Sequence, residues 1–583
     1  MQLSKEQRRD FAIYQSYYEG RDDDHYTEHR ATEKELYRVK VNRVLQPVDA
    51  WCSDLDLCNL ATRRADYMID WIVDLREPLT MELINAKLHT LEARAMEYKC
   101  TGLDLEQQLQ SMVKRLGCEL YWRRQLRRAQ VQKREAQEQR AGHICAKNMP
   151  YVHDVTTARY TERQNANRVM LEQTEIESAD GETITLWDAV QSSTANKSIR
   201  RGELMTRIRG CEEWATEAGM VGIFTTNTLP SRFHASLFKG GKNPNHNGET
   251  PRDGQQWLSK TWARARAKIQ RQRIKVFGFR VAEPHHDGCP HWHMLLWVPT
   301  EQAQQLKDLL RDCWLQQEGD EYGAQDARFK SESIDPSRGG AIAYVAKYIS
   351  KNIDDFGAVG EEGHFDHQGE QVELIEGGNK ARRVTAWASA WGIRQFQPIG
   401  QPPVTVWREL RRIDESMAAG ASKRLQRAHA AVHKTEGKRA DWKAYMHEQG
   451  GAMVGRGYQL RLEFDKEQKE GRYGPCEVAT PAGVYDVARG VSELCTSNRK
   501  KWKPKGTWTP SERHTAKVGT WGELAVLAVL DPTWTRFNNC TQPPKGKPWK
   551  NQKHHGNGPK RPLASSPQHG TKLQCTLKPS PGT

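Results

Sequence analysis

The sequence predicts an α+β fold between about residues 201 and 415, in which a central antiparallel sheet is flanked by helices. Three observations support this prediction. Segments rich in β-branched and aromatic residues occur at 221–228, 274–285 and 291–299. The short, turn-rich link between the second and third segments is typical of a β-hairpin. Helical patterns then follow the third segment, and this alternation of strands and helices is typical of a compact α+β domain.

The elements after the hairpin can be assigned in order. A helix is predicted over residues 300–317, and a short strand is predicted over 327–335. A Pro-Ser-Arg-Gly-Gly turn then leads into a second helix over 341–353. The apolar side chains that recur at helical spacing in the first helix are Leu306, Leu309, Leu310 and Trp314.

Three further regions are expected around this domain. Residues 1–200 are expected to be mostly helical, because they contain long charged runs that carry alanine and leucine. Residues 416–495 have a similar charged composition and are expected to be helical as well. Residues 496–583 are rich in Pro, Gly, Ser, Lys and His, so we expect a basic and largely disordered tail.

The net charge of +15 and the pI near 9.2 favour a polyanionic partner. Residues 496–583 contain 16 Lys/Arg and 3 Asp/Glu, so most of the excess positive charge lies in the expected tail. One interpretation is that this tail contacts DNA phosphates without sequence preference. The alternative is that it only increases solubility.

Several classes of protein are disfavoured. The chain has a mean hydropathy of -0.82, contains no apolar run long enough for a membrane span and starts with the polar segment MQLSKEQRRDF. We therefore expect a soluble, intracellular protein. The 12 cysteines form no C-x-x-C pair, so free thiols are expected, with a metal site at Cys52/Cys58 or Cys100/Cys118 as the alternative.

Two histidines define the first candidate site. His291 and His293 lie on either side of Trp292 in the segment HWHMLLWV. Side chains alternate faces along a strand, so both imidazoles point the same way while Trp292 and every second residue after it point into a core. Two imidazoles on one rigid face are two ligands of a metal site. Because a chain with 20 histidines contains such a pair by chance, packed or exposed histidines are the alternative.

A third ligand is predicted in the preceding strand. A hairpin turn through residues 287–290 would bring Glu283 back beside the two histidines. One carboxylate and two imidazoles with open positions suit Mg²⁺ or Mn²⁺ when phosphate oxygens complete the shell. His285, His286 and Asp287 are the other candidates for this ligand.

Two tyrosines form the second candidate site. Tyr344 and Tyr348 are four residues apart in the predicted helix, so both phenols lie on one face, with Lys347 and Lys351 on or near the same stripe. Simple packing explains most tyrosine pairs of this kind. A tyrosine oxygen can, however, attack a phosphodiester that a metal ion polarises, giving a 5′-phosphotyrosine that conserves the bond energy. The nearby lysine or the cation would help to form the phenolate.

These motifs resemble those of a known family. The segments FTTNTLPSRFHA at 224–235, EPHHDGCPHWHMLLW at 283–297 and YVAKYISK at 344–351 occur in this order within about residues 200–415. They are similar to motifs of the phage replication gene A protein family. That family consists of rolling-circle initiators with two tyrosines, within the His-hydrophobe-His (HUH) endonuclease superfamily. TPRDGQQWLSKTWARARAKIQR and RRVTAWASAWGIRQFQPIG also look typical of the phage branch.

The resemblance implies metal binding by His291 and His293, nucleophiles at Tyr344 and Tyr348, and an assisting role for Lys347. The position of the third ligand varies across the superfamily. The implied fold is an HUH-type endonuclease domain with a central antiparallel sheet. The implied substrate is single-stranded or extruded origin DNA, with the host replicative helicase and polymerase as partners. In agreement, the sequence has no P-loop for an ATP-driven motor.

Three rival functions share some of these features. A nucleotide hydrolase with alternating histidines would require another histidine near Leu295. A relaxase or single-strand transposase shares the same chemistry, but the tyrosine pair favours an initiator. A non-catalytic DNA-binding factor would use the same histidines and tyrosines as core residues.

Overall fold

The computed structural model describes residues 46–75, 79–94, 96, 105–237, 241–335, 340–344 and 377–505. Every described residue belongs to one compact unit. The fold mixes helices with antiparallel sheets, which confirms the predicted α+β class. Among the described helices, none combines the length and the apolar character needed to cross a membrane.

Helices make up most of the described chain before residue 174. Ser53 starts the first of them with a capping box, in which its side chain and that of Asp56 bond reciprocally to the backbone. Apolar residues recur every three or four positions along this helix, Asp54–Asp74, and pack against the helices that follow it to form a separate core. The helices are α3 (Asp54–Asp74), α4 (Met81–Thr90), α5 (Leu105–Leu116), α6 (Glu119–Ala141) and α7 (Asp154–Gln173).

A buried ionisable group connects α6 to the start of α7. Glu135 is fully buried and accepts hydrogen bonds from the Thr156 hydroxyl and from the backbone N–H of His153. Burial raises the pKa of Glu135 to about 7, because the charged carboxylate loses its hydration. The neighbouring Arg134 is also buried and donates to the same hydroxyl.

Glu135→Gln is expected to stabilise the protein at pH 8 and to have little effect at pH 5. The pKa of Glu135 is higher in the folded protein than the value of 4.5 in the unfolded chain, so the protonated side chain stabilises the folded state at a pH below 4.5. This stabilisation is lost as the pH rises through about 7. At pH 8 the penalty is roughly 3 kcal/mol, which the neutral amide avoids. Thermal unfolding at both pH values, with the exposed Glu172→Gln as control, measures the difference. A variant that is equally destabilised at both pH values would contradict the expectation.

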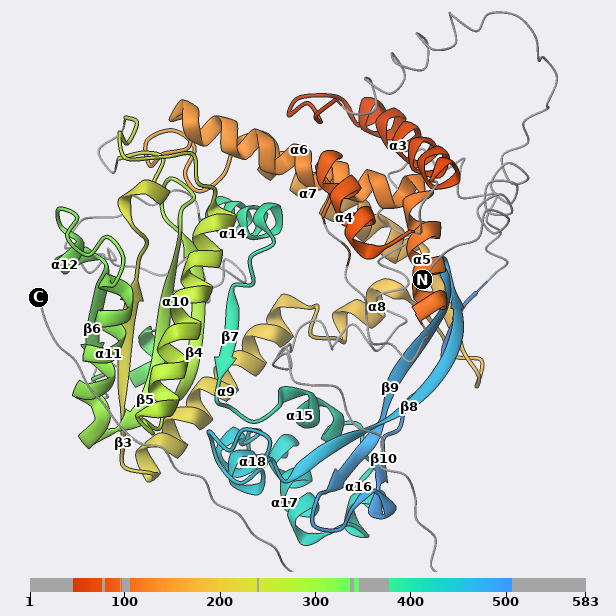
Figure 1. Ribbon diagram of the computed structural model, residues 1–583. Helices are drawn as coiled ribbons and strands as arrows, with labels where there is room; N and C mark the ends of the chain where they lie inside the picture. The colour runs from red at the N-terminus through yellow and green to blue at the C-terminus, as the bar shows by residue number, and fades with distance from the viewer. Residues whose placement is uncertain are drawn as a thin grey trace, which may run out of the picture. The chain divides into compact units, whose positions relative to one another are not determined.

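The central sheet has five strands in the order β6-β3-β5-β4-β7, and every pair is antiparallel (Figure 1). Four of the strands lie, to within one residue, in the segments in which the sequence predicts strands. The fifth, β7, was not predicted. The strands are β3 (Met220–Asn227), β4 (Phe277–Pro284), β5 (Pro290–Pro299), β6 (Phe329–Ser333) and β7 (Phe396–Ile399).

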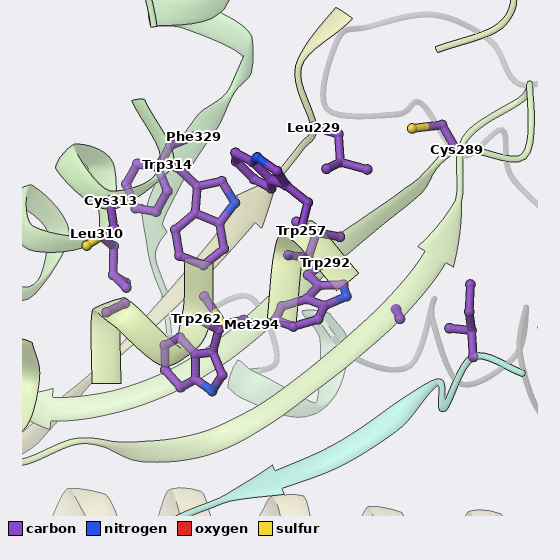
Figure 2. Packing of buried hydrophobic residues seen from close by; sticks show 14 of the residues in the cluster. Leu229, Trp257, Trp262, Cys289, Trp292, Met294, Leu310, Cys313, Trp314 and Phe329 are labelled. Carbon is purple, nitrogen blue, oxygen red and sulfur yellow. The ribbon is translucent and has the colours of Figure 1, made fainter. Parts of the chain in front are cut away.

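Both faces of this sheet are covered. On one face, Trp292, Met294 and the next alternate residues of β5 enter a core with aromatic side chains such as Trp257 and Trp314, which confirms their predicted direction (Figure 2). On the other face, Leu295 and Trp297 enter a second core. The first core is covered by α10 (Pro251–Arg271), α11 (Ala303–Leu315) and α14 (Gly377–Trp391). The second is covered by α9 (Lys197–Glu217), α15 (Val404–Leu410), α17 (Lys423–Val432) and α18 (Trp442–Glu448).

The prediction of a helical region over 416–495 is wrong for its second half, which forms a long antiparallel hairpin. Leu460, Leu462 and Phe464 alternate with polar residues, and this pattern is that of a strand. The many Glu, Lys and Gln residues between them are good helix formers and favoured the wrong assignment. The hairpin and its third strand are β8 (Leu460–Gly471), β9 (Gly474–Asp486) and β10 (Cys495–Thr496), after the short helix α16 (Glu415–Ala419).

The boundary of the expected tail at residue 496 is also wrong. The strand β11 (Trp502–Pro504) pairs with β1 (Glu175–Ser178), and Ile176 lies opposite Pro504. The backbone hydrogen bonds of this small sheet thus outweigh the polar composition of the segment. Residues 506–583, where the expected disorder falls, lie outside the described part of the chain. The remaining elements in the described ranges are β2 (Thr183–Thr185), α8 (Leu186–Gln191), α12 (Ala324–Ala327) and three short 3₁₀ turns, Ser231–Phe233, Thr300–Gln302 and Val491–Glu493.

Candidate metal centre

The β4–β5 hairpin brings the three predicted metal ligands together. Its register places Glu283 directly opposite His291 and places Val281 opposite His293. The turn is closed by a hydrogen bond of 2.7 Å from the backbone N–H of His285 to the carbonyl of Cys289. Gly288 has a φ of +82°, which is the left-handed conformation that glycine adopts without strain.

The ligand atoms of Glu283, His291 and His293 all lie within 4.8 Å of one another. The Nε2 atoms of the two histidines are 2.8 Å apart, and a carboxylate oxygen of Glu283 is 4.0 Å from His293 Nε2. All three side chains are buried, with exposed fractions of 9% or less. In the described part of the chain, this is the one group of its kind that could hold a metal ion.

The chemistry of these atoms fits a divalent cation. Two imidazole nitrogens at 2.8 Å need a shared proton or a cation between them, because two lone pairs repel each other. The buried carboxylate of Glu283 supplies a compensating negative charge beside them. Two imidazoles and one carboxylate leave coordination positions open for a substrate oxygen.

Thr226 supports one of these ligands from the neighbouring strand. It lies opposite His293 in the pairing of β3 with β5, and its hydroxyl is 3.1 Å from His293 Nδ1. This contact orients the imidazole ring and leaves Nε2 directed toward Glu283 and His291. The sequence prediction missed this residue, although it lies in the segment FTTNTLPSRFHA that resembled a family motif.

The other three candidates for the third ligand have different roles. Asp287 accepts from the backbone N–H of Cys289 and contacts His234 Nδ1 at 3.1 Å. Burial alone would raise its pKa, but the positive charge of His234 holds the pKa of Asp287 well below its usual range. The ring of His285 packs against that of His291 at 4.0 Å, and the carbonyl of His286 accepts from the Tyr151 N–H. Only Glu283 contributes an atom to the group described above.

Contacts from distant helices hold the turn of the hairpin. Trp387 on α14 donates from its indole N–H to the carbonyl of Gly288 at 2.8 Å. Gln139 on α6 donates to the carbonyl of Asp287 at 3.0 Å. Because both donors act on the turn itself, they help to fix the hairpin end at which Glu283 and His291 lie.

Tyr344 lies close to these residues through one intervening ring. Residues 340–344 are helical, and Tyr344 is half-buried against the same core as Phe224. The Phe224 ring is 5.6 Å from the Tyr344 ring and 5.5 Å from the His293 ring. The backbone N–H of Ala341 donates to Glu212 on α9, which anchors this helical segment. The two other predicted residues of this site, Lys347 and Tyr348, lie outside the described residues.

Comparisons with known proteins identify relatives among phage replication proteins. Residues 88–356 match the family model of the bacteriophage replication gene A protein (GPA). The chain is 38% identical to the replication gene A protein of Escherichia phage 186, over 75% of this chain and 60% of that protein. It is 38% identical to the probable replication protein P12 of Pseudoalteromonas phage PM2, over 81% of this chain and 72% of that protein.

A further relative carries a more specific name. The chain is 29% identical to a probable replication endonuclease from a prophage-like region of Salmonella paratyphi A, over 85% of this chain and 60% of that protein. The chain thus spans about 60% of the length of two of these three relatives. No solved structure matches the chain.

Proposed function

Because the chain belongs to the bacteriophage replication gene A protein family, we propose that it is an endonuclease of phage DNA replication. More specifically, it nicks one DNA strand at a replication origin, becomes linked to the 5′ end through a tyrosine and so starts rolling-circle replication. The name of the Salmonella relative, a probable replication endonuclease, supports the coarser part of this proposal.

One observation carries the finer part. A buried group of one carboxylate and two imidazoles is connected to a tyrosine through one ring, because Phe224 contacts both His293 and Tyr344. Glu283, His291 and His293 would hold Mg²⁺ or Mn²⁺, and Tyr344 would provide a nucleophile within reach of the same DNA phosphate. These residue types can support strand nicking by a side-chain nucleophile in place of water.

Each protein group has a defined role in this proposal. His291, His293 and Glu283 fix the position of the bound cation, and Thr226 orients His293. When bound, the cation polarises the non-bridging oxygens of the phosphate and stabilises the departing 3′ oxygen. The buried surroundings of the three ligands strengthen these electrostatic interactions, because little water competes for them.

The covalent step transfers the phosphate to tyrosine. The phenol of Tyr344 or Tyr348 loses its proton, and Lys347 stabilises the phenolate. The phenolate oxygen then bonds to phosphorus while the bond from phosphorus to the 3′ oxygen breaks, and the 3′ oxygen takes up a proton. The resulting 5′-phosphotyrosine can later be attacked by a 3′-OH, so the strand is rejoined without ATP.

Two tyrosines would allow the reaction to be repeated. One holds the first 5′ end while the other cuts the regenerated origin after a full circle has been copied. The enzyme would depend on the host replicative helicase and polymerase, in the host cytoplasm, for unwinding and synthesis. A relaxase or single-strand transposase would share the nicking step, but the tyrosine pair favours the initiator.

The proposal is tested by incubating the protein with single-stranded DNA that carries candidate origin sequences. We expect nicking in the presence of Mg²⁺ or Mn²⁺, no nicking in EDTA, and a protein-DNA adduct that resists denaturation by detergent. Specific DNA binding without any nicking under all metal conditions would instead indicate the non-catalytic DNA-binding factor.

A further inference from the structure

Five arginines gather at the β7 edge of the central sheet. Two lie on α9, one lies on β4, one directly precedes β7 and one lies on α15. One of them, Arg408, forms an ion pair with Glu203 through two hydrogen bonds of 2.7 and 2.8 Å. The arginine cluster consists of Arg200, Arg207, Arg280, Arg394 and Arg408.

Arg280 is buried without a carboxylate partner. It is 6% exposed, stacks over the Trp292 ring at 4.1 Å and donates to the backbone carbonyl of Arg394 at 3.0 Å. Burial, and then the positive charge of Arg394, lowers the pKa of Arg280 to about 9, so it remains a cation at neutral pH. No carboxylate in the described ranges lies within ion-pair distance of it.

Arg207, on α9, is a second buried cation, and it contacts β4 from the opposite face of the sheet. It is 7% exposed, donates to Gln401 at 3.0 Å and lies over the rings of Phe279 and Trp442. Among the described residues it has no carboxylate within ion-pair distance either. The charge of Glu203 partly offsets that of Arg207, whereas Arg280 has no such carboxylate among the described residues. A buried charge without a counter-ion is costly, so an anion bound at this edge would stabilise Arg280.

The exposed members make the cluster accessible from solvent. Arg200 is exposed and Arg394 is half-buried. Crowding by neighbouring protein atoms, and after it the charges of Arg408 and Arg394, lowers the pKa of Arg200. The guanidinium groups are therefore close enough to repel one another, and an anion placed between them would relieve that repulsion.

The cluster begins beside the metal centre. Phe396 pairs with Val281, which pairs with His293, so these three residues lie in one row across the sheet. The backbone N–H of Ala282 donates to the carbonyl of Gln395 at 2.8 Å, which continues the same register. Arg394 therefore lies in the row of Glu283 and His291. At the usual strand spacing, its backbone is about 10 Å from that of His291.

We propose that the arginine cluster binds backbone phosphates of the DNA strand adjacent to the phosphate that is cut at the metal centre. The inference rests on the proposed endonuclease function and adds the path that the strand follows, across the β7 edge. Guanidinium groups bind phosphate oxygens in pairs, and contacts of this kind position a strand without reading its sequence.

The test measures binding without cleavage. In EDTA, the affinity for a fluorescein-labelled oligothymidine of about 30 nucleotides is measured by anisotropy at several NaCl concentrations, with wild-type protein and with Arg200→Gln/Arg394→Gln. We expect roughly tenfold weaker binding at 0.1 M salt. The slope of log K against log salt should become shallower by about 1.4, the value for two lost phosphate contacts on a single strand.

The matched control is Arg168→Gln/Arg489→Gln, which removes two exposed arginines, each with a side chain 61% exposed, outside the cluster. It should retain the wild-type affinity and slope, and equal thermal midpoints should show that every variant is folded. An unchanged slope in the cluster variant, or an equal loss in the control, overturns the proposal. Nicking is scored separately: if the wild type binds as expected but never nicks, the endonuclease proposal fails while the cluster stands.

Discussion

His291→Ala is expected to reduce Mg²⁺- or Mn²⁺-dependent nicking by about a thousandfold or more, because the loss of a ligand removes several kcal/mol of transition-state stabilisation. His291 lies at the centre of the ligand group, with its Nε2 2.8 Å from that of His293 and its backbone opposite Glu283. The initial nicking rate on single-stranded origin DNA is the primary measurement.

A second readout separates metal binding from catalysis. Mn²⁺ should raise the thermal midpoint of the wild-type protein, because a ligand that binds only the folded state stabilises it, and this rise should be lost in His291→Ala. The control is His433→Ala. His433 also lies 3.1 Å from another histidine, His429, but no acidic residue joins them in a ligand group of the described chain. Undiminished nicking by His291→Ala would remove this residue from the proposed centre.

Tyr344→Phe/Tyr348→Phe is expected to abolish the covalent adduct and to lower nicking by roughly ten-thousandfold, because no phenol oxygen remains to attack phosphorus. Each single variant should still form some adduct if the two tyrosines can substitute for each other. Adducts are measured by denaturing electrophoresis with DNA labelled on the 3′ side of the cut.

The control for this pair is Tyr322→Phe, which removes a fully exposed hydroxyl. It should form adduct at the wild-type rate. An adduct that persists in the double variant, with all three proteins folded, would show that another side chain is the nucleophile. Metal binding should be unchanged in the double variant, which distinguishes it from His291→Ala.

Much of the candidate centre could be predicted from short-range patterns. The alternation in HWHMLLWV determines which β5 side chains share a face, and the turn before it determines that Glu283 returns beside His291. These inferences depend only on strand geometry and on one tight turn. Glu283, the predicted third ligand, therefore lies beside the histidine pair, whereas Asp287 contacts His234.

The missed features depend on contacts between distant segments. Thr226 supports His293 only because β3 pairs with β5, and no local pattern encodes that pairing. The strand β7 is four residues long and contains Pro398, which lowers its apparent β character. Proline is tolerated there because β7 is the last strand of the sheet, where one side of the backbone needs no strand partner. The arginine cluster, built from four separate segments of the chain, was not predictable for the same reason.

The pairing of β11 with β1 has a practical consequence for shortened forms of the protein. A truncation at residue 496 would remove Trp502–Pro504 and leave Ile176 and its neighbours with unsatisfied backbone groups. Weaker DNA binding by such a truncated protein would then result from the lost strand pairing near α7 and α8, and not from the loss of the basic segment. Shortened proteins intended to isolate the contribution of the positive charge should therefore retain Lys505, whose backbone N–H still donates to Glu175.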